Sequence, residues 1–300
     1  MSLPEDVVEK YHRAGKIVRE IREEMKHFVK EGMPIIEICE KVEEFINKKD
    51  GVPAFPCNVS IDEIAAHYTS PPGDERVVPS NSLVKVDIGA HINGYIADSA
   101  VTVCFSPEHE KLAKAAEEAL RVAIKTIQGG ISTSKLGSAI QRIIKAYGCK
   151  PVSNLTGHQI GRYLIHTGKS VPNVPHLIGS KIKVGDVVAI EPFVTVAKAA
   201  GRVNNGNEKT IFRFVKRKSV DNLYGRRLLD YIQRNFKTLP FAERWFKGFM
   251  PQEHYLSAFQ KLLRIKCLTA YPVFIEASKK PVAQAEHTVL VGKNGCEVLT

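Results

Sequence analysis

The chain has 300 residues, of which 44% are hydrophobic and 25% are charged. These proportions are ordinary for a folded globular protein and exclude disordered, collagen-like and coiled-coil classes. No apolar run approaches the roughly 18 residues of a membrane span, and the first residues lack the charged-then-apolar pattern of a secretion signal. The 6 cysteines form no C-x-x-C pair, which disfavours a disulfide scaffold and a structural zinc site. We therefore expect a cytoplasmic protein that contacts no membrane.

Two pairs of helices are predicted, one near the start and one near the middle of the chain. Apolar positions at helical spacing predict helices over 7–30 and 34–47. A second pair is predicted over about 106–128, where Ser-Pro forms a typical helix start, and over about 134–147. A shift of 98 residues places the second pair on the first, which indicates two related halves.

Strands follow both helix pairs. The alternating and apolar runs predict strands over 83–91, 95–105, 183–196, 286–291 and 296–299. The dipeptide Asn93-Gly94 separates the first two and is the strongest short signal for a hairpin, and Asn294-Gly295 predicts a second hairpin. We therefore expect an α+β fold of two halves packed about a shared sheet, with an active site between them.

One segment interrupts this pattern. Three helical stretches, over about 219–236, 240–249 and 252–265, lie between two β regions. We interpret 205–270 as an inserted helical subdomain, and 1–204 together with 271–300 as the main domain.

The basic charge is concentrated in this insertion. Residues 209–266 include 14 Lys and Arg but only 4 Asp and Glu, a net of +10 out of the formal +11. Any field that attracts polyanions therefore comes from this segment. On the residues alone, ordinary solvated helix faces explain the same charges.

The first hairpin places two carboxylates side by side. If Asn93-Gly94 is its two-residue loop, Gly89 faces Asp98, and Asp87 is a diagonal neighbour roughly 5 to 8 Å away at Cβ. Uncompensated carboxylates on a half-buried face are unfavourable, and a metal ion is the usual remedy. Alternatively, these aspartates belong to a solvated hairpin face.

Three further residues favour the metal. Glu191 ends an otherwise apolar strand, Glu286 begins another, and His158 follows a glycine that permits close backbone approach. Individually each is also explained as a capped loop carboxylate or a hydrogen-bonded core histidine. Together they form an oxygen-rich set with one imidazole, which suits a pair of divalent ions better than one tetrahedral zinc.

These motifs carry a family resemblance. Segment 86–98, with Gly157-His158, Ile190-Glu191-Pro192 and 283–288, resembles the ligand set of methionine aminopeptidases. The resemblance implies the pita-bread fold, whose two pseudo-symmetric halves match the suspected repeat. Residues 55–69 and Ile165-His166 resemble the segments that carry the two catalytic histidines of that family.

The insertion indicates a subfamily. Residues 235–245 are similar to the helical insert of type II enzymes, which type I enzymes lack. Since no long extension precedes the first helix, the chain resembles the short, archaeal-style form. Prolidases and aminopeptidase P share the ligands but usually carry an extra N-terminal domain, whereas only 86 residues precede Asp87.

The resemblance implies removal of N-terminal methionine from nascent proteins and peptides, with a small second residue, by a monomeric enzyme. It implies two divalent ions (Co, Mn, Fe or Zn) bound by Asp87, Asp98, His158, Glu191 and Glu286. Glu191 would be the general base. His67 and His166 would bind the substrate and the tetrahedral intermediate, and Phe55 and Tyr271 would border the methionine pocket.

Three alternatives stay open. A catalytically silent pita-bread protein would bind nucleic acid or partners through the insertion, and a prolidase-like enzyme would cleave Xaa-Pro bonds. For the basic segment 209–266, one hypothesis is contact with ribosomal RNA, and the other is that its charges belong to ordinary solvated helix faces.

Overall fold

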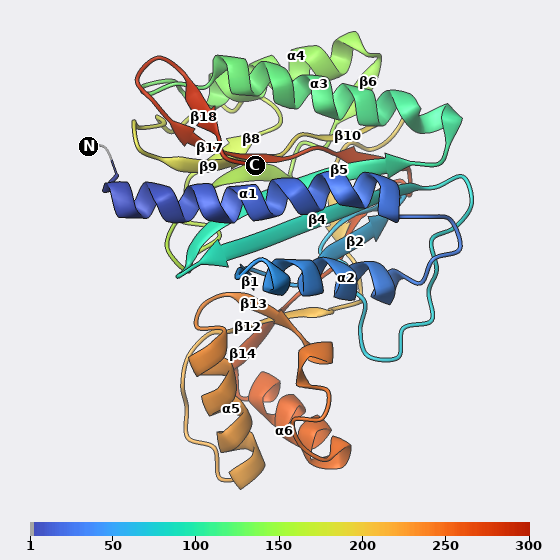
Figure 1. The fold of residues 1–300 in the computed structure, drawn as a ribbon. Helices are drawn as coiled ribbons and strands as arrows, with labels where there is room; N and C mark the ends of the chain where they lie inside the picture. Colours follow the sequence, from blue (N-terminus) through green and yellow to red (C-terminus); the bar gives the residue numbers. More distant parts are fainter. Residues whose placement is uncertain (1–2) are drawn as a thin grey trace.

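Four helices and two groups of strands form the main body of the computed structural model, which describes residues 3–300. The helices are α1 (Glu5–Phe28), α2 (Ile35–Lys48), α3 (Glu110–Thr126) and α4 (Thr133–Ala146). In Figure 1, α1 runs along β4 and β5, while α3 and α4 lie together at the top of the molecule. These helices confirm the four predicted from periodicity, except that the third begins with a 3-10 turn (Pro107–His109).

The predicted hairpin organises the first half. It consists of β4 (Leu83–Ile92) and β5 (Tyr95–Cys104), and β4 also pairs with β1 (Val52–Pro53) and β2 (Asn58–Ile61). Ile92 faces Tyr95 and Gly89 faces Asp98, as the two-residue loop requires. Both loop residues have positive φ, 52° at Asn93 and 88° at Gly94, which explains why this dipeptide occupies the turn.

The second half contains a five-stranded sheet in the order β18-β17-β9-β7-β8. Its strands are β7 (Thr156–Ile160), β8 (Ser170–Pro172), β9 (Val187–Ile190), β17 (His287–Val291) and β18 (Cys296–Val298). The second predicted hairpin is confirmed, since Val291 pairs with Cys296, although its loop has four residues. The predicted strand over 183–196 is instead two strands, because Glu191-Pro192 separates β9 from β10 (Phe193–Val196).

Smaller sheets connect these parts. Their strands are β3 (Ile64–Ala66), β6 (Cys149–Pro151), β11 (Val203–Asn205), β15 (Phe274–Glu276) and β16 (Val282–Gln284). The two halves meet along β5, where Glu286 N donates to Ala100 O at 3.1 Å and Thr102 Oγ1 donates to Gln284 O at 2.7 Å. The strands around the predicted carboxylates thus come from both halves.

Residues 211–271 project below the halves in Figure 1 and have a separate core rich in aromatic side chains. Their elements are β12 (Ile211–Phe214), α5 (Leu223–Asn235), β13 (Pro240–Ala242), η2 (Glu243–Phe246), α6 (Gln252–Arg264) and β14 (Leu268–Tyr271). The helix predicted over 240–249 is wrong, because Phe241 pairs with Phe212 of β12 and Pro240 begins a strand. A three-stranded sheet, β13-β12-β14, therefore supports the two helices.

A buried ion pair fastens this segment to the first half. Arg244 of η2 donates to the carboxylate of Glu43 on α2, and both side chains are at most 10% exposed. Among residues 3–300, no helix combines the length and the apolar character needed to cross a membrane.

Candidate metal centre and substrate cavity

One cavity of about 220 Å³ is lined by both halves and by β12–β14. Its wall includes every residue that the sequence predicted for a site. These residues are Phe55, His67, Asp87, Asp98, His158, His166, Glu191, Tyr271 and Glu286. The chain therefore gathers nine positions spread over more than 200 residues into one enclosed space.

Three of these side chains form its most buried part. Asp98, His158 and Glu286 are 2% to 5% exposed, and each offers a ligand atom within 4.8 Å of the others. His158 Nε2 lies 3.6 Å from Asp98 Oδ2 and 3.6 Å from Glu191 Oε1. A nitrogen donor therefore faces oxygen donors across a gap that is too wide for strong hydrogen bonds.

Burial disfavours the charged form of all four carboxylates, and the charges of neighbouring carboxylates add to this effect at Asp98, Glu191 and Glu286. Burial raises the pKa of Asp87 to about 6. Burial, followed by the charges of Asp87 and Glu191, raises the pKa of Asp98 well above its ordinary value. Burial and neighbouring carboxylates act in the same direction on Glu191 and Glu286. Without a cation, this cluster would hold protons at pH values where isolated carboxyl groups are ionised.

The donor set fits divalent cations. Asp87 Oδ1 and Asp98 Oδ1 are buried and, among residues 3–300, have no hydrogen-bond partner. Buried oxygens without partners are costly in an apoprotein but serve as ligands when a cation is present. Four carboxylates and one imidazole match hard or borderline ions such as Mn²⁺, Fe²⁺, Co²⁺ or Zn²⁺.

The hairpin positions two of the candidate ligands, Asp87 and Asp98. Asp87 and Asp98 lie on one face of the hairpin, and Asn58, the β2 partner of Asp87, donates to its Oδ2 at 3.2 Å. On the other face, Val84, Val86 and Ile88 belong to the core beneath α1, as predicted. The pleat thus separates ligand residues from core residues.

Two glycines permit the close approach of the cavity walls. A Cβ at Gly89 would lie 2.1 Å from Phe55 Cε1, so only glycine lets this ring pack over the hairpin beside Asp98. A Cβ at Gly157 would lie 2.3 Å from Ala189 O, so glycine lets β7 lie close to β9 and carry His158 into the cluster. The predicted close approach at Gly157 is confirmed.

A backbone hydrogen bond orients the His158 ring. Its Nδ1 lies 2.8 Å from Ile165 O, so the tautomer that donates from Nδ1 leaves a lone pair on Nε2. Burial lowers the pKa of His158 to about 3, and His166 lowers it further. The ring is therefore neutral at pH 7 and presents Nε2 to the carboxylates.

Two further histidines lie on the other side of the cavity. His67 follows β3 with φ of 65°, and its ring packs against Tyr271 and Phe274 at centroid distances of 5.7 Å and 4.5 Å. Burial lowers the pKa of His67 to about 4, and its buried Nδ1 has no partner among residues 3–300. The ring therefore offers an unused polar atom to a bound molecule.

His166 lies at the mouth. The His166 side chain is exposed to solvent, and its ring centroid is 4.2 Å from that of His158. Loss of water against the cavity wall lowers the pKa of His166, and the positive charge of Arg213 lowers it further. Both neutral histidines can donate or accept hydrogen bonds at pH 7.

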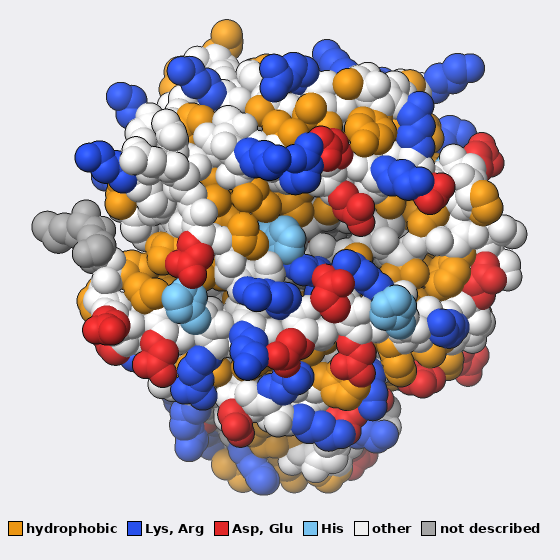
Figure 2. Space-filling view, turned by 45° about the horizontal axis from the view of Figure 1, so that its top comes forward, with side chains coloured by type: hydrophobic (Ala, Val, Ile, Leu, Met, Phe, Trp, Pro, Cys, Tyr) orange, Lys and Arg blue, Asp and Glu red, His pale blue; other side chains and the backbone are white. Residues whose placement is uncertain are grey.

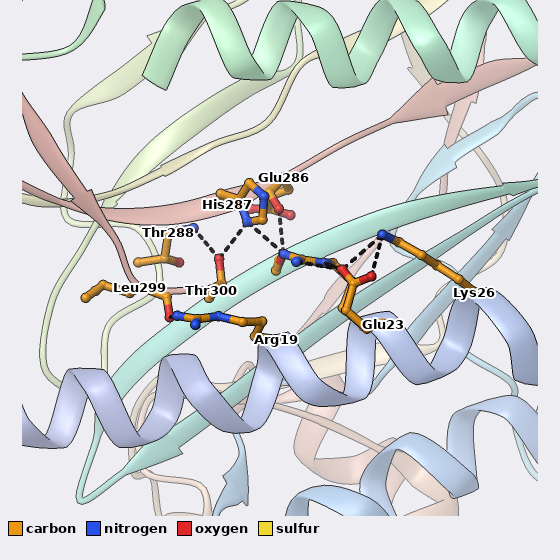
Figure 3. Close-up of polar contacts among 10 residues, drawn as sticks. Arg19, Glu23, Lys26, Glu286, His287, Thr288, Leu299 and Thr300 are labelled. Carbon is orange, nitrogen blue, oxygen red and sulfur yellow. Dashed lines mark hydrogen bonds and ion pairs between the residues drawn. The ribbon is translucent and has the colours of Figure 1, made fainter. Parts of the chain in front are cut away.

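A polar network behind the cavity holds the backbone of the Glu286 strand. Ser99 Oγ donates to Glu286 O at 2.5 Å, and Arg22 Nη1 of α1 donates to Ser99 Oγ at 2.9 Å. Arg22 also lies 2.7 Å from His287 Nδ1, which in turn contacts Thr300 Oγ1 at 2.9 Å. In Figure 3, Glu286, His287 and Thr300 lie on the side of this network away from α1, from which Arg19, Glu23 and Lys26 project.

Sequence patterns missed several contributors. Asn58 supports Asp87, while Gln284 Nε2 reaches Glu191 Oε2 at 3.5 Å and Glu286 Oε2 at 3.3 Å. In the sequence, only the positions of Asn58 and Gln284 within the segments that carry the family resemblance indicated a role for them. Arg213, on β12, also lines the cavity and had been counted only as part of a basic surface.

Known proteins match the chain over nearly its full length. Residues 9–293 match the model of "Metallopeptidase family M24". A methionine aminopeptidase of Methanothermobacter thermautotrophicus is 41% identical over 297 residues, which cover 98% of this chain and 99% of that protein. One from Methanocaldococcus jannaschii is 44% identical over 292 residues, 97% of this chain and 98% of that protein.

Solved structures share the fold. A thermophilic Arx1 superimposes with a TM-score of 0.85 at 20% identity, covering 99% of this chain and 91% of that chain. A methionine aminopeptidase from Thermotoga maritima gives 0.72 at 22% identity, covering 100% and 98%. The prolidase from Pyrococcus furiosus gives 0.63 at 18% identity, covering 99% of this chain but 64% of the prolidase. The predicted pita-bread fold is confirmed. The chain belongs to metallopeptidase family M24 and, within it, to the methionine aminopeptidases.

Proposed function

We propose that this chain hydrolyses the first peptide bond of polypeptides that begin with methionine. The observation that carries the proposal is the convergence of four carboxylates and His158 at the buried end of a cavity of about 220 Å³. The high identity to archaeal methionine aminopeptidases supports the choice of substrate. A preference for a small second residue comes from the family resemblance and is part of the proposal.

The cavity's five donor residues would hold two divalent cations. We assign Asp87 to one ion, Asp98 and Glu286 to both, and His158 and Glu191 to the other. When bound, two such cations lower the pKa of water to near neutrality and polarise the scissile carbonyl. The elevated pKa values of the four carboxyl groups mean that these groups release protons as the cations bind.

Glu191 is our choice for the general base. It is less buried than Asp98 and Glu286, and it lies at the edge of the cluster, so a substrate and a water can reach it. Its pKa is raised mainly by burial, which makes the carboxylate a stronger base. Glu191 would take a proton from the attacking water and deliver it to the leaving amine.

His67 and His166 would stabilise the reacting carbonyl. Both are neutral at pH 7, since their pKa values are lowered, and His67 Nδ1 is unused. N–H groups aimed at developing negative charge stabilise the transition state more than the substrate. Because both rings line the cavity, they would also fix the orientation of the peptide.

Phe55, Ile211 and Tyr271 would border the methionine side chain. Phe55 and Ile211 are buried, and Tyr271 pairs with Ile211 across β14 and β12. Such a pocket separates side chains that differ by one methylene by about 1 to 3 kcal/mol. We therefore expect slow cleavage of norleucine and leucine analogues.

A metal-dependent release assay tests this function. Protein loaded with Mn²⁺ or Co²⁺ should release methionine from Met-Ala-Ser, and chelation or Asp98→Asn should abolish release. A protein that binds metal but releases nothing would be the silent alternative. Faster cleavage of Xaa-Pro substrates would identify a prolidase-like enzyme instead.

The insertion provides a separate proposal about partners. Figure 2 shows Lys and Arg side chains over this whole face of the molecule, interspersed with Asp and Glu, whereas the excess of basic residues in segment 209–266 comes from the sequence. We propose that segment 209–266 contacts ribosomal RNA and brings a monomeric cytoplasmic enzyme to nascent N-termini. Charge reversal at the exposed Lys216, Arg217 and Lys218 should reduce co-sedimentation with ribosomes at low salt. Equal co-sedimentation would contradict the proposal.

A further inference from the structure

One charged side chain in the cavity has no role in the mechanism above. Arg213 lies on β12 opposite Pro240 of β13 and Thr269 of β14, and it lines the same cavity as the predicted ligands. It is half-buried, and its buried Nε atom has no hydrogen-bond partner among residues 3–300. Because Arg213 lines the cavity, its guanidinium group is placed to bind an anionic group of a molecule in the cavity.

The neighbours of Arg213 do not neutralise its charge. Its charge lowers the pKa of His166, and its charge together with a side-chain hydrogen bond to Tyr271 opposes the burial that raises the pKa of Tyr271. Both neighbours are uncharged at pH 7. By contrast, Arg213 is not among the charges that shift the pKa values of the four clustered carboxyl groups. The guanidinium therefore acts on the part of the wall formed by His166 and Tyr271.

The exposure of the cavity wall fixes the direction of a bound peptide. The carboxylate cluster and Phe55 are at the buried end, whereas Leu164 is 40% exposed and His166 and Thr238 are also exposed. An aminopeptidase substrate must place its first residue at the buried end. The rest of the peptide then leaves past His166 and its neighbour Arg213.

Chain geometry decides which residue Arg213 meets. An extended peptide advances about 3.3 Å per residue, so its third and fourth residues lie roughly 7 to 10 Å beyond the first peptide bond. A long arginine side chain beside His166 reaches this region of the exit path. Guanidinium binds carboxylate with two hydrogen bonds in a fixed geometry, so a carboxylate is its best complement.

We propose that Arg213 binds a carboxylate on the third or fourth residue of the substrate. The enzyme then prefers N-termini in which Asp or Glu follows the methionine and the small second residue. This specificity rests on the proposed aminopeptidase function and adds a substrate class to it. Arg213 contacts the substrate away from the reacting atoms, so its effect belongs in KM rather than in kcat.

Matched amidated peptides test the proposal. Met-Ala-Asp-Gly-Gly-amide and Met-Ala-Gly-Asp-Gly-amide are compared with the same peptides carrying Asn, which removes only the charge. For the unmodified protein we expect at least one Asp peptide to have a KM roughly fivefold lower than its Asn partner at low salt, and a smaller ratio in 0.5 M NaCl. Arg213→Met should bring the ratio to one, and Arg213→Lys should restore part of it.

Control experiments separate the Arg213 proposal from a general loss of activity and from a nonspecific effect of removing one positive charge. Arg202→Met removes an exposed arginine outside the cavity and should keep the Asp preference. Non-amidated Met-Ala-Gly shows whether a C-terminal carboxylate substitutes for the side chain. An unchanged Asp-to-Asn ratio in Arg213→Met would overturn the proposal. If no peptide is hydrolysed, the aminopeptidase function fails, and fluorescence anisotropy of labelled Asp and Asn peptides on both proteins still tests Arg213.

Discussion

Removing the guanidinium of Arg244 should destabilise the whole molecule, because this side chain joins the insertion to the first half. Its Nη1 donates to Thr69 Oγ1 at 2.8 Å and to Ser70 O at 2.9 Å, and its Nη2 donates to Glu43. Glu43 is 7% exposed, and it also accepts from Trp245 Nε1 at 2.8 Å and from Cys57 N at 3.1 Å. All of these donors and acceptors are internal.

The magnitude follows from what Arg244→Met leaves behind. Breaking a buried ion pair from one side costs about 3 to 5 kcal/mol, mainly because the remaining charge stays buried. Since Glu43 keeps two hydrogen bonds, we expect a loss of about 3 kcal/mol in the free energy of unfolding at pH 8. Burial already raises the pKa of Glu43, and Arg244 opposes this rise. Without the arginine, a proton neutralises Glu43 more readily, so the deficit should shrink at pH 5.

Urea unfolding followed by tryptophan fluorescence measures these values, and a double-mutant cycle isolates the pair. Glu43→Gln combined with Arg244→Met should cost at least 1 kcal/mol less than the sum of the single changes. Thr69 and Ser70 follow His67 by two and three residues, so kcat/KM on a Met-Ala peptide should fall as well. Additive single effects, or a loss below about 0.5 kcal/mol in Arg244→Met, would refute the reasoning.

Three other predictions concern the ligands and one buried histidine. Ser99→Ala removes the hydroxyl that donates to Glu286 O and should weaken Mn²⁺ binding, measured by calorimetry, several-fold; unchanged affinity would contradict a supporting role. Mn²⁺ at 100 times its Kd should stabilise the protein by about 2.7 kcal/mol, whereas Asp98→Asn should lose most of this gain in thermal unfolding. Burial and Lys237 lower the pKa of His91 to about 4, below its unfolded value of about 6.5. The stability that neutral His91 contributes above pH 6.5 is therefore lost as the pH falls towards 4. This loss amounts to about 2 kcal/mol at pH 5. In urea titrations, the free energy of unfolding of His91→Asn should therefore fall less steeply with decreasing pH.

Local signals predicted the parts of the site that depend on neighbouring residues. Asn93-Gly94 fixes the hairpin register because both positions need positive φ, and this register places Gly89 opposite Asp98. The alternation of Asp87 with Val86 and Ile88 then follows from the strand period alone. Residues close in sequence thus revealed two of the five proposed ligands.

The sequence gives no local pattern for the remaining features, because these features depend on contacts between residues that are far apart in the chain. Pro240 to Ala242 lie in an amphipathic context, yet pairing with β12 makes them a strand. The support that Ser99 gives Glu286 joins residues 187 positions apart, so no spacing rule anticipates it. Arg213 was indistinguishable from other basic residues until β12 and the cavity were placed.

The arrangement of the supporting hydrogen bonds explains how repelling carboxylates remain ordered. Thr288 Oγ1 donates to Asp98 O and accepts from Asp98 N, both at 2.8 Å, while Ser99 Oγ holds Glu286 O. These bonds fix the backbone of Asp98 and Glu286, while Asp87 Oδ1 and Asp98 Oδ1 keep no hydrogen-bond partner among residues 3–300. If the same donors bound the carboxylate oxygens, they would lower the pKa values but compete with a cation for the lone pairs. The fold therefore provides rigidity through the main chain, and the oxygens of Asp87 and Asp98 that lack partners stay available to the proposed cations.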